Sequence, residues 1–180
     1  RKKLFKINKK LNGAFNVSVD KIYSKYTFID TFESRIRFVN GDIVFEQLLL
    51  NLKKLGAVDV TGIIKNEEKF SIFKFEQNIF IDNLKTFFSR FGIHNKKKIP
   101  YDLFVAGNLN LTSFILHLHE ISSASKFEEE DINYIEREFN DILLNKDYES
   151  FFNFVNLKEF VQSISLESNY EYLQRHYYHL

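Results

Sequence analysis

Apolar and polar residues alternate in short runs along the first two-thirds of the chain. Runs of this kind open at Gly13, Gly41 and Gly107, and another, residues 58–64, contains Gly62. Because successive side chains of a strand point to opposite sides, each run predicts a strand with one apolar and one polar face. Such strands, joined by short polar turns, favour an antiparallel meander sheet with one apolar face.

The turn residues predict the order in which these strands pair. Asn12-Gly13 and Asn40-Gly41 are strong hairpin-turn dipeptides. They predict that residues 3–9 pair with residues 13–22, and that residues 27–39 pair with the strand that follows. The remaining strands are expected at 57–65, 70–80, 102–111 and 113–121.

The strand alternation changes in two places before residue 100. Leu49 interrupts it within a leucine-rich run, which indicates a bulge or a second covered face there. Over residues 83–92 the apolar positions follow helical spacing, and Gly92 lies where a helix would end, so a short amphipathic helix is expected. The apolar positions of this helix are Leu84, Phe87, Phe88 and Phe91.

The chain after residue 125 predicts helices. Ser125 and Glu128 have the spacing of a capping box, and apolar stripes continue through residues 132–143 and 148–164. The predicted fold is therefore α+β and mainly β. A curved antiparallel meander over residues 1–121 contains the inserted helix 83–92, and residues 122–180 form a C-terminal helical segment of the same domain that packs on the sheet.

Composition narrows the function classes. The 180 residues contain 25 Lys and Arg against 24 Asp and Glu, a balance that argues against nucleic acid as a partner. The absence of Cys removes disulfides and thiolate chemistry. The sequence begins at Arg1 and contains no Met, so it is expected to be an internal or C-terminal fragment of a longer protein. No apolar run approaches the roughly 20 residues that span a bilayer.

The sequence offers little that points to catalysis. His117 and His119 lie two residues apart, and His176 and His179 three apart, but a metal needs further ligands and Glu120 is expected to point to the opposite face. A solvated strand face is therefore the preferred interpretation of the first pair. No phosphate-binding loop or activated nucleophile is recognisable, so we expect no enzyme activity, no catalytic residues, no metal and no cofactor.

Three sequence segments within the predicted strands resemble those of a known family. They are Asn40-Gly-Asp-Ile-Val-Phe-Glu-Gln-Leu-Leu-Leu-Asn-Leu52, then Lys54-Leu-Gly-Ala-Val-Asp-Val-Thr-Gly62, and Val105-Ala-Gly-Asn-Leu-Asn-Leu111. This stretch resembles the C-terminal region of AsmA-like proteins, which belong with TamB-like proteins among the repeating β-groove envelope proteins. The resemblance covers about residues 11–121.

The resemblance implies a periplasmic protein, anchored at the inner membrane by a segment outside this chain. It implies a curved sheet whose apolar side carries phospholipid acyl chains between membranes and supports outer-membrane homeostasis and biogenesis. The remainder of the parent β-groove chain would then be a partner. The family has no catalytic residues to transfer to this sequence.

Period-two spacing predicts which side chains form the apolar face, and the resemblance implies that this face is the lipid-facing one. The predicted side chains are Phe15, Val17, Ile43, Phe45, Val58, Val60, Leu109 and Leu111. An acyl chain needs a continuous apolar surface rather than hydrogen-bonding groups. The alternative is that the amphipathic helices bury this face completely, in which case the chain is a non-catalytic capping or protein-interaction module.

Overall fold

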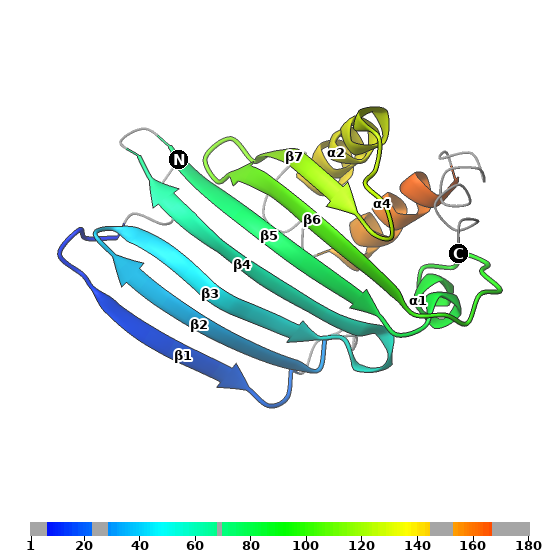
Figure 1. Cartoon of the computed structure of the whole chain (residues 1–180), viewed down its shortest axis with the longest axis horizontal. Coiled ribbons are helices and arrows are strands. Elements are labelled where there is room, and N and C mark those ends of the chain that lie inside the picture. The colour runs from blue at the N-terminus through cyan, green and yellow to red at the C-terminus, as the bar shows by residue number, and fades with distance from the viewer. Residues whose placement is uncertain (1–6, 23–28, 68–69, 145–152, 167–180) are drawn as a thin grey trace.

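Seven strands form one antiparallel sheet in chain order, as expected from the sequence (Figure 1). The computed structural model describes residues 7–22, 29–67, 70–144 and 153–166. The strands are β1 (Gly13–Val19), β2 (Thr31–Val39), β3 (Asp42–Asn51), β4 (Gly56–Asn66), β5 (Ser71–Ile81), β6 (Tyr101–Asn110) and β7 (Ile115–Ser122). The sheet is open and twisted, with β1 and β7 at its two edges.

The Asn40-Gly41 turn between β2 and β3 is confirmed. Asn40 has a φ of 53° and Gly41 a φ of 93°, the left-handed conformations that a two-residue hairpin turn requires. A short 3₁₀ turn, Lys53–Leu55, joins β3 to β4.

The hairpin predicted at Asn12-Gly13 is wrong for the part of the chain that the structure describes. No strand precedes β1 there, and β1 pairs with β2. The Asn12 side chain instead accepts a hydrogen bond from the Asn40 backbone N–H at 3.0 Å. Asn side chains compete with backbone groups as acceptors in this way, so Asn12 supports the neighbouring turn instead of forming its own. Residues 3–6 of the predicted strand lie outside the described residues.

The bulge expected near Leu49 lies three residues earlier. Arg35 pairs with Gln47 and Ile36 with Phe45, which leaves Glu46 as the extra residue of β3. The insertion reverses the alternation, so that Leu48 falls on the same face as Phe45. Leu49 therefore lies on the opposite face.

A second bulge corrects the placement of Glu120. Gly107 pairs with Leu118 and Ala106 with Glu120, so His119 is the extra residue of β7. Glu120 consequently lies on the same face as His117, and not on the opposite face as the alternation alone had predicted.

The inserted helix and the two C-terminal helices are confirmed. They are α1 (Leu84–Arg90), α2 (Glu129–Leu143) and α4 (Phe154–Leu166). The side chain of Asn83 caps α1 by accepting from the Thr86 N–H at 3.0 Å, and Gly92, with a φ of 75°, ends the helical segment. The helix predicted from residue 148 begins at Phe154, and residues 148–152 lie outside the described residues.

The predicted capping box at Ser125 is wrong. The helix α2 begins at Glu129, and its N-cap, Glu128, makes no side-chain cap hydrogen bond. Backbone pairing explains the later start, because the Ser125 carbonyl accepts from the Ser123 N–H and the Phe127 N–H donates to the Ile121 carbonyl. These bonds hold the segment against the end of β7. The start of α2 is stabilised by the acidic residues of its first turn, whose negative charge interacts favourably with the helix dipole.

The best-buried part of the molecule lies at one end of the sheet, where the helices gather (Figure 1). A core cluster joins α1 and α4 to the end of β5, and it consists of Ile81, Leu84, Phe88, Phe91 and Val161. Gln162 of α4 donates a hydrogen bond to the Phe91 carbonyl at 2.8 Å, and the rings of Phe91 and Phe154 stack. The helices are thus fixed to the sheet at this end.

Side chains of α2 cover the outer edge of β7. The Asn140 amide both donates to the Leu116 carbonyl at 3.0 Å and accepts from the Leu116 N–H at 2.8 Å. Glu136 accepts from the Leu118 N–H at 2.7 Å. These carboxylate and amide groups take the place of a further strand, so this edge of the sheet is capped.

Candidate functional site: an apolar sheet face

The strand register collects apolar side chains into rows that cross the sheet on one side, which we call the apolar face. One row runs Phe15, Ile36, Phe45, Gly62, Phe75, Gly107, Leu118 from β1 to β7. The next runs Val17, Ser34, Leu48, Val60, Gln77, Val105, Ile121. On the other side of the first row runs Gly13, Phe38, Ile43, Ile64, Phe73, Leu109, Leu116.

Most of the apolar face is only half-buried. Among its residues Phe45, Val58, Val60 and Leu109 keep intermediate exposure. Exposure rises toward β1, where 49% of Phe15, 43% of Val17 and 36% of Val19 remain exposed. A contiguous exposed apolar surface of this kind marks a binding site more often than isolated exposed residues do.

Aromatic rings cover the two central glycines of this face. Phe45 packs edge-on against Phe73, which stacks on Phe75, each pair with ring centroids 5.6 Å apart. A Cβ added to Gly107 would lie 3.2 Å from Phe75 Cζ, and one added to Gly62 would lie 2.8 Å from Phe73 Cε2. The glycines therefore leave the space that these rings occupy.

Polar groups interrupt the apolar face at two points. Ser34 is 2% exposed, and its hydroxyl donates a hydrogen bond to the Gln47 carbonyl at 3.2 Å. This buried polar group therefore has a partner within the protein. Gln77 of β5 is half-buried in the same row. The surface is otherwise formed by aliphatic and phenylalanine side chains and by glycine backbone.

The helices cover one end of the apolar face. Ile79 and Tyr101 pack against the core cluster of α1 and α4, beyond the rows described above. Burial raises the pKa of the Tyr101 hydroxyl above its ordinary value, although a hydrogen bond with the Ser123 side chain lowers it in part. The covered end is thus the part of this face where the alternative interpretation, burial by helices, applies.

The predicted lipid-facing residues fall largely within these rows. Phe15 and Phe45 share one row, Val17 and Val60 the next, and Ile43 and Leu109 a third. Val58 lies on the same face, opposite Leu50 and Ile79. Ile43 is 7% exposed and so contributes mainly to packing.

Leu111 is placed differently from the other predicted residues. It follows the last residue of β6, and its N–H donates to the Ser71 carbonyl at 2.9 Å. The register of β6 with β7 includes no partner for Leu111, so strand pairing does not fix it on the apolar face.

The list of predicted lipid-facing residues omits several that belong to the same face. They are Phe32, Ile36, Phe38, Leu48, Leu50, Ile64, Phe73, Phe75, Leu103 and Val105. The signal that could have found them is the strand alternation itself, continued from one strand to the next. In β3 this alternation can be followed only when the position of the Glu46 bulge is known. Before the bulge the odd-numbered residues of β3 lie on the apolar face, and after it the even-numbered residues do.

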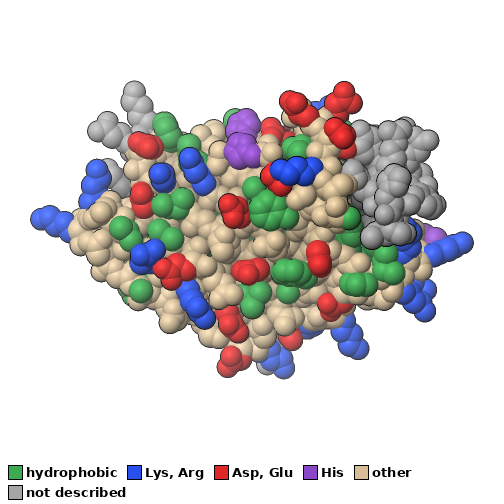
Figure 2. Space-filling view, in the orientation of Figure 1, with side chains coloured by type: hydrophobic (Ala, Val, Ile, Leu, Met, Phe, Trp, Pro, Cys, Tyr) green, Lys and Arg blue, Asp and Glu red, His purple; other side chains and the backbone are tan. Residues whose placement is uncertain are grey.

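The opposite, polar face carries interspersed acidic and basic side chains (Figure 2). Arg37 and Glu46 form an ion pair there at 3.0 Å, with about half of each side chain exposed. Such a pair contributes little to stability, because water screens it. The mixture of signs gives this face no single-sign surface for an anionic or cationic partner.

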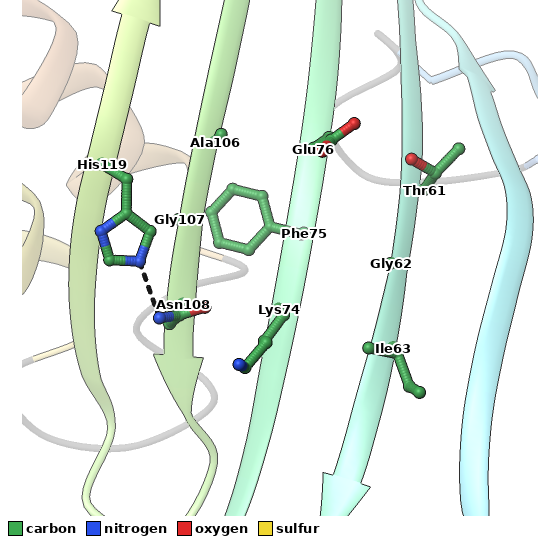
Figure 3. A pocket seen from close by; sticks show the side chains of 10 residues that line it. All are labelled: Thr61, Gly62, Ile63, Lys74, Phe75, Glu76, Ala106, Gly107, Asn108 and His119. Carbon is green, nitrogen blue, oxygen red and sulfur yellow. Dashed lines mark hydrogen bonds between the residues drawn. The ribbon is translucent and has the colours of Figure 1, made fainter.

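The polar face is hollowed where β4 to β7 pass the two glycines (Figure 3). The hollow has a volume of about 380 Å³ and is lined by Thr61, Gly62, Ile63, Lys74, Phe75, Glu76, Ala106, Gly107, Asn108 and His119. The Asn108 amide nitrogen lies 2.7 Å from His119 Nε2. Thr61 lies opposite Glu76 in this lining.

The histidine pair of β7 makes separate contacts. His117 Nδ1 lies 3.2 Å from Glu136 Oε1, while His119 contacts Asn108. Within the described ranges, no three His, Asp or Glu side chains gather as metal ligands would. His176 and His179 lie outside those ranges.

No helix in the part of the chain that the structure describes is long and apolar enough to cross a membrane. Comparisons with models of protein families, with curated proteins and with solved structures found no match to this chain. The geometry of the apolar face is therefore the basis for the functional argument.

Proposed function

We propose that the apolar face binds the acyl chains of phospholipids. In this proposal the chain is part of an AsmA-like envelope protein that takes part in phospholipid transport between membranes and in outer-membrane homeostasis. The parent protein would be periplasmic and anchored at the inner membrane outside this chain. No residue is assigned a catalytic role.

The observation that carries the proposal is the continuity of the apolar rows across the sheet. Most of their residues are half-buried or exposed, and the rows become buried at β7, where Leu116 is 4% and Ile121 3% exposed. Seven strands have six intervals of about 4.8 Å, so a row spans about 29 Å. An acyl chain occupies half of a hydrocarbon core that is about 30 Å thick. The face is therefore large enough for an acyl chain lying across several strands.

The chemistry of the face suits such a ligand. Each methylene transferred from water to an apolar surface contributes about 0.8 kcal/mol when fully buried. The face presents few hydrogen-bonding side chains, so it could form few specific hydrogen bonds with a polar ligand. A headgroup would remain at the rim or in water.

A second candidate function is a non-catalytic capping or protein-interaction module. The contact of α1 and α4 with Ile79, Ile81 and Tyr101 favours it, because helices already bury one end of the face. In this case the remaining rows would be covered by a protein partner, such as the remainder of the parent β-groove chain.

Native mass spectrometry of the chain purified without detergent separates the two candidates. Co-purifying phospholipid, with a matching mass added to the protein, is the result expected for the lipid-binding face. A lipid-free, monodisperse protein that binds no dye specific for apolar surfaces would contradict it and favour the module.

A further inference from the structure

The two edges of the sheet differ in how their backbone groups are satisfied. Asn140 and Glu136 of α2 pair with the outer backbone groups of β7. At the other edge, β1 pairs with β2, and none of the described residues pairs with its outer side. Figure 1 shows β1 as the outermost strand, far from the helices.

The sequence of β1 lacks the features that protect an edge strand. Gly13–Val19 contains no charged residue and no proline, whereas edge strands usually carry lysine, proline or a bulge that prevents pairing with another chain. The register with β2 is continuous over all of β1, so the strand is regular. The exposed side chains Phe15, Val17 and Val19 lie on its apolar side.

We propose that the outer edge of β1 pairs with the same edge of a second copy of this chain, antiparallel and centred on Asn16. The strand is self-complementary about this residue. Phe15 of each copy lies opposite Val17 of the other on the apolar face, and Ala14 lies opposite Ser18 on the polar face. No charge within β1 opposes this pairing.

The geometry of this pairing keeps the two apolar faces together. A two-fold axis through the Asn16 pair is perpendicular to the sheet, so the apolar rows of both copies lie on the same side. Because the β7 edge is capped, each copy has one available edge among its described strands, and the assembly closes as a dimer. The inference goes beyond the proposed function and does not depend on lipid.

Single-cysteine crosslinking tests the register directly, since the chain contains no cysteine of its own. In the proposed dimer the Cβ atoms of the two residues at position 16 are about 5 Å apart, close enough for a disulfide after a small adjustment. Residue 14 is four positions from its counterpart along the paired strands, about 13 Å. Asn16→Cys should therefore form a covalent dimer under mild oxidation, and Ala14→Cys should not.

The two cysteine variants are matched, because Asn16 and Ala14 are both exposed and lie on the same face of β1. Efficient crosslinking of Ala14→Cys, or failure of Asn16→Cys to crosslink, would overturn the proposal. Either outcome leaves the lipid-binding proposal untouched.

Sedimentation velocity tests the same edge without a covalent bond. The chain should sediment as a concentration-dependent dimer, and Val17→Lys should make it monomeric because two lysines would face the opposing Phe15 rings. Val155→Lys is the matched control: this valine of α4 is 64% exposed and distant from β1, and its substitution should leave the dimer intact. A wild-type monomer at every concentration, or a dimer unaffected by Val17→Lys, would contradict the proposal.

Discussion

At the scale of single residues, glycine determines how closely the aromatic rings pack on the apolar face. Gly62 and Gly107 lie in the same cross-strand row as Phe45 and Phe75, and the rings of β5 occupy the space above them. The packing of these rings therefore requires glycine at both positions. This role was not visible in the sequence, where Gly107 only opens a run of alternating residues within the strand expected over 102–111.

Gly107→Ala should destabilise the chain. Its Cβ would meet the His117 carbonyl oxygen at 2.6 Å as well as the Phe75 ring, so backbone and ring must both move. We expect a loss of about 1–3 kcal/mol in the free energy of unfolding, measured by denaturant titration. Gly13→Ala is the matched control, because its Cβ would meet no atom closer than 3.5 Å. Equal stability of the two variants would contradict this account.

Tyr101 should make stability depend on pH in the alkaline range. Its folded pKa lies above the ordinary value of 10.0, so above that pH the folded state retains a proton that the unfolded state has lost. The contribution of the buried, neutral Tyr101 hydroxyl to the free energy of unfolding is therefore fully present below pH 10. It is lost as the pH rises through the folded pKa.

The measurement is the free energy of unfolding of wild type and Tyr101→Phe between neutral and alkaline pH. Above about pH 10 the wild type should lose more stability than the variant, because the variant has no hydroxyl to titrate. Parallel pH profiles would show that burial of Tyr101 does not affect its ionisation.

At the scale of elements, α2 stabilises β7 by pairing with its outer backbone groups. Asn140→Leu should leave the Leu116 N–H and carbonyl without their side-chain partner, at a cost of about 1–3 kcal/mol. Hydrogen exchange at the Leu116 amide should accelerate in the same variant. Asn133→Leu, an exposed position on α2, is the control and should change neither quantity. Unchanged exchange at Leu116 in Asn140→Leu would contradict the capping role.

The sequence predicts the elements better than it predicts their pairing. Alternation was sufficient for β2 to β7, and helical spacing for α1, because both signals are local. The bulge at Glu46 was displaced by three residues, since one extra residue reverses the faces of everything that follows. The Asn12-Gly13 hairpin was wrong because the Asn12 side chain bonds to a turn 28 positions away.

The candidate site was predicted in part for the same reason. Phe15, Val17, Phe45 and Val60 could be assigned to one face from spacing alone. Joining them into rows required the register of all seven strands. The contact of Val161 with the α1 end of the sheet depends on packing between distant segments, which local patterns do not encode.

At the scale of the whole molecule, the apolar rows run from a covered part of the sheet to an exposed one, since Leu116 and Ile121 of β7 are buried and Phe15 and Val17 of β1 are exposed. The helices α1 and α4 close one end, and α2 caps the β7 edge, while the rows continue toward β1 with increasing exposure. The core cluster between α1, α4 and the end of β5 stabilises the fold at this end of the sheet. It supports the proposal that the remainder of the apolar face is a binding surface.

Binding of a phospholipid with a fluorescent acyl chain to two matched valine variants tests that proposal most directly. Val60 and Val44 are half-buried valines on neighbouring strands, but Val60 belongs to the apolar face and Val44 to the polar face. Val60→Asn should weaken binding several-fold relative to wild type, while Val44→Asn should bind as wild type does. Equal binding by both variants, or no binding by wild type, would contradict a lipid-binding apolar face.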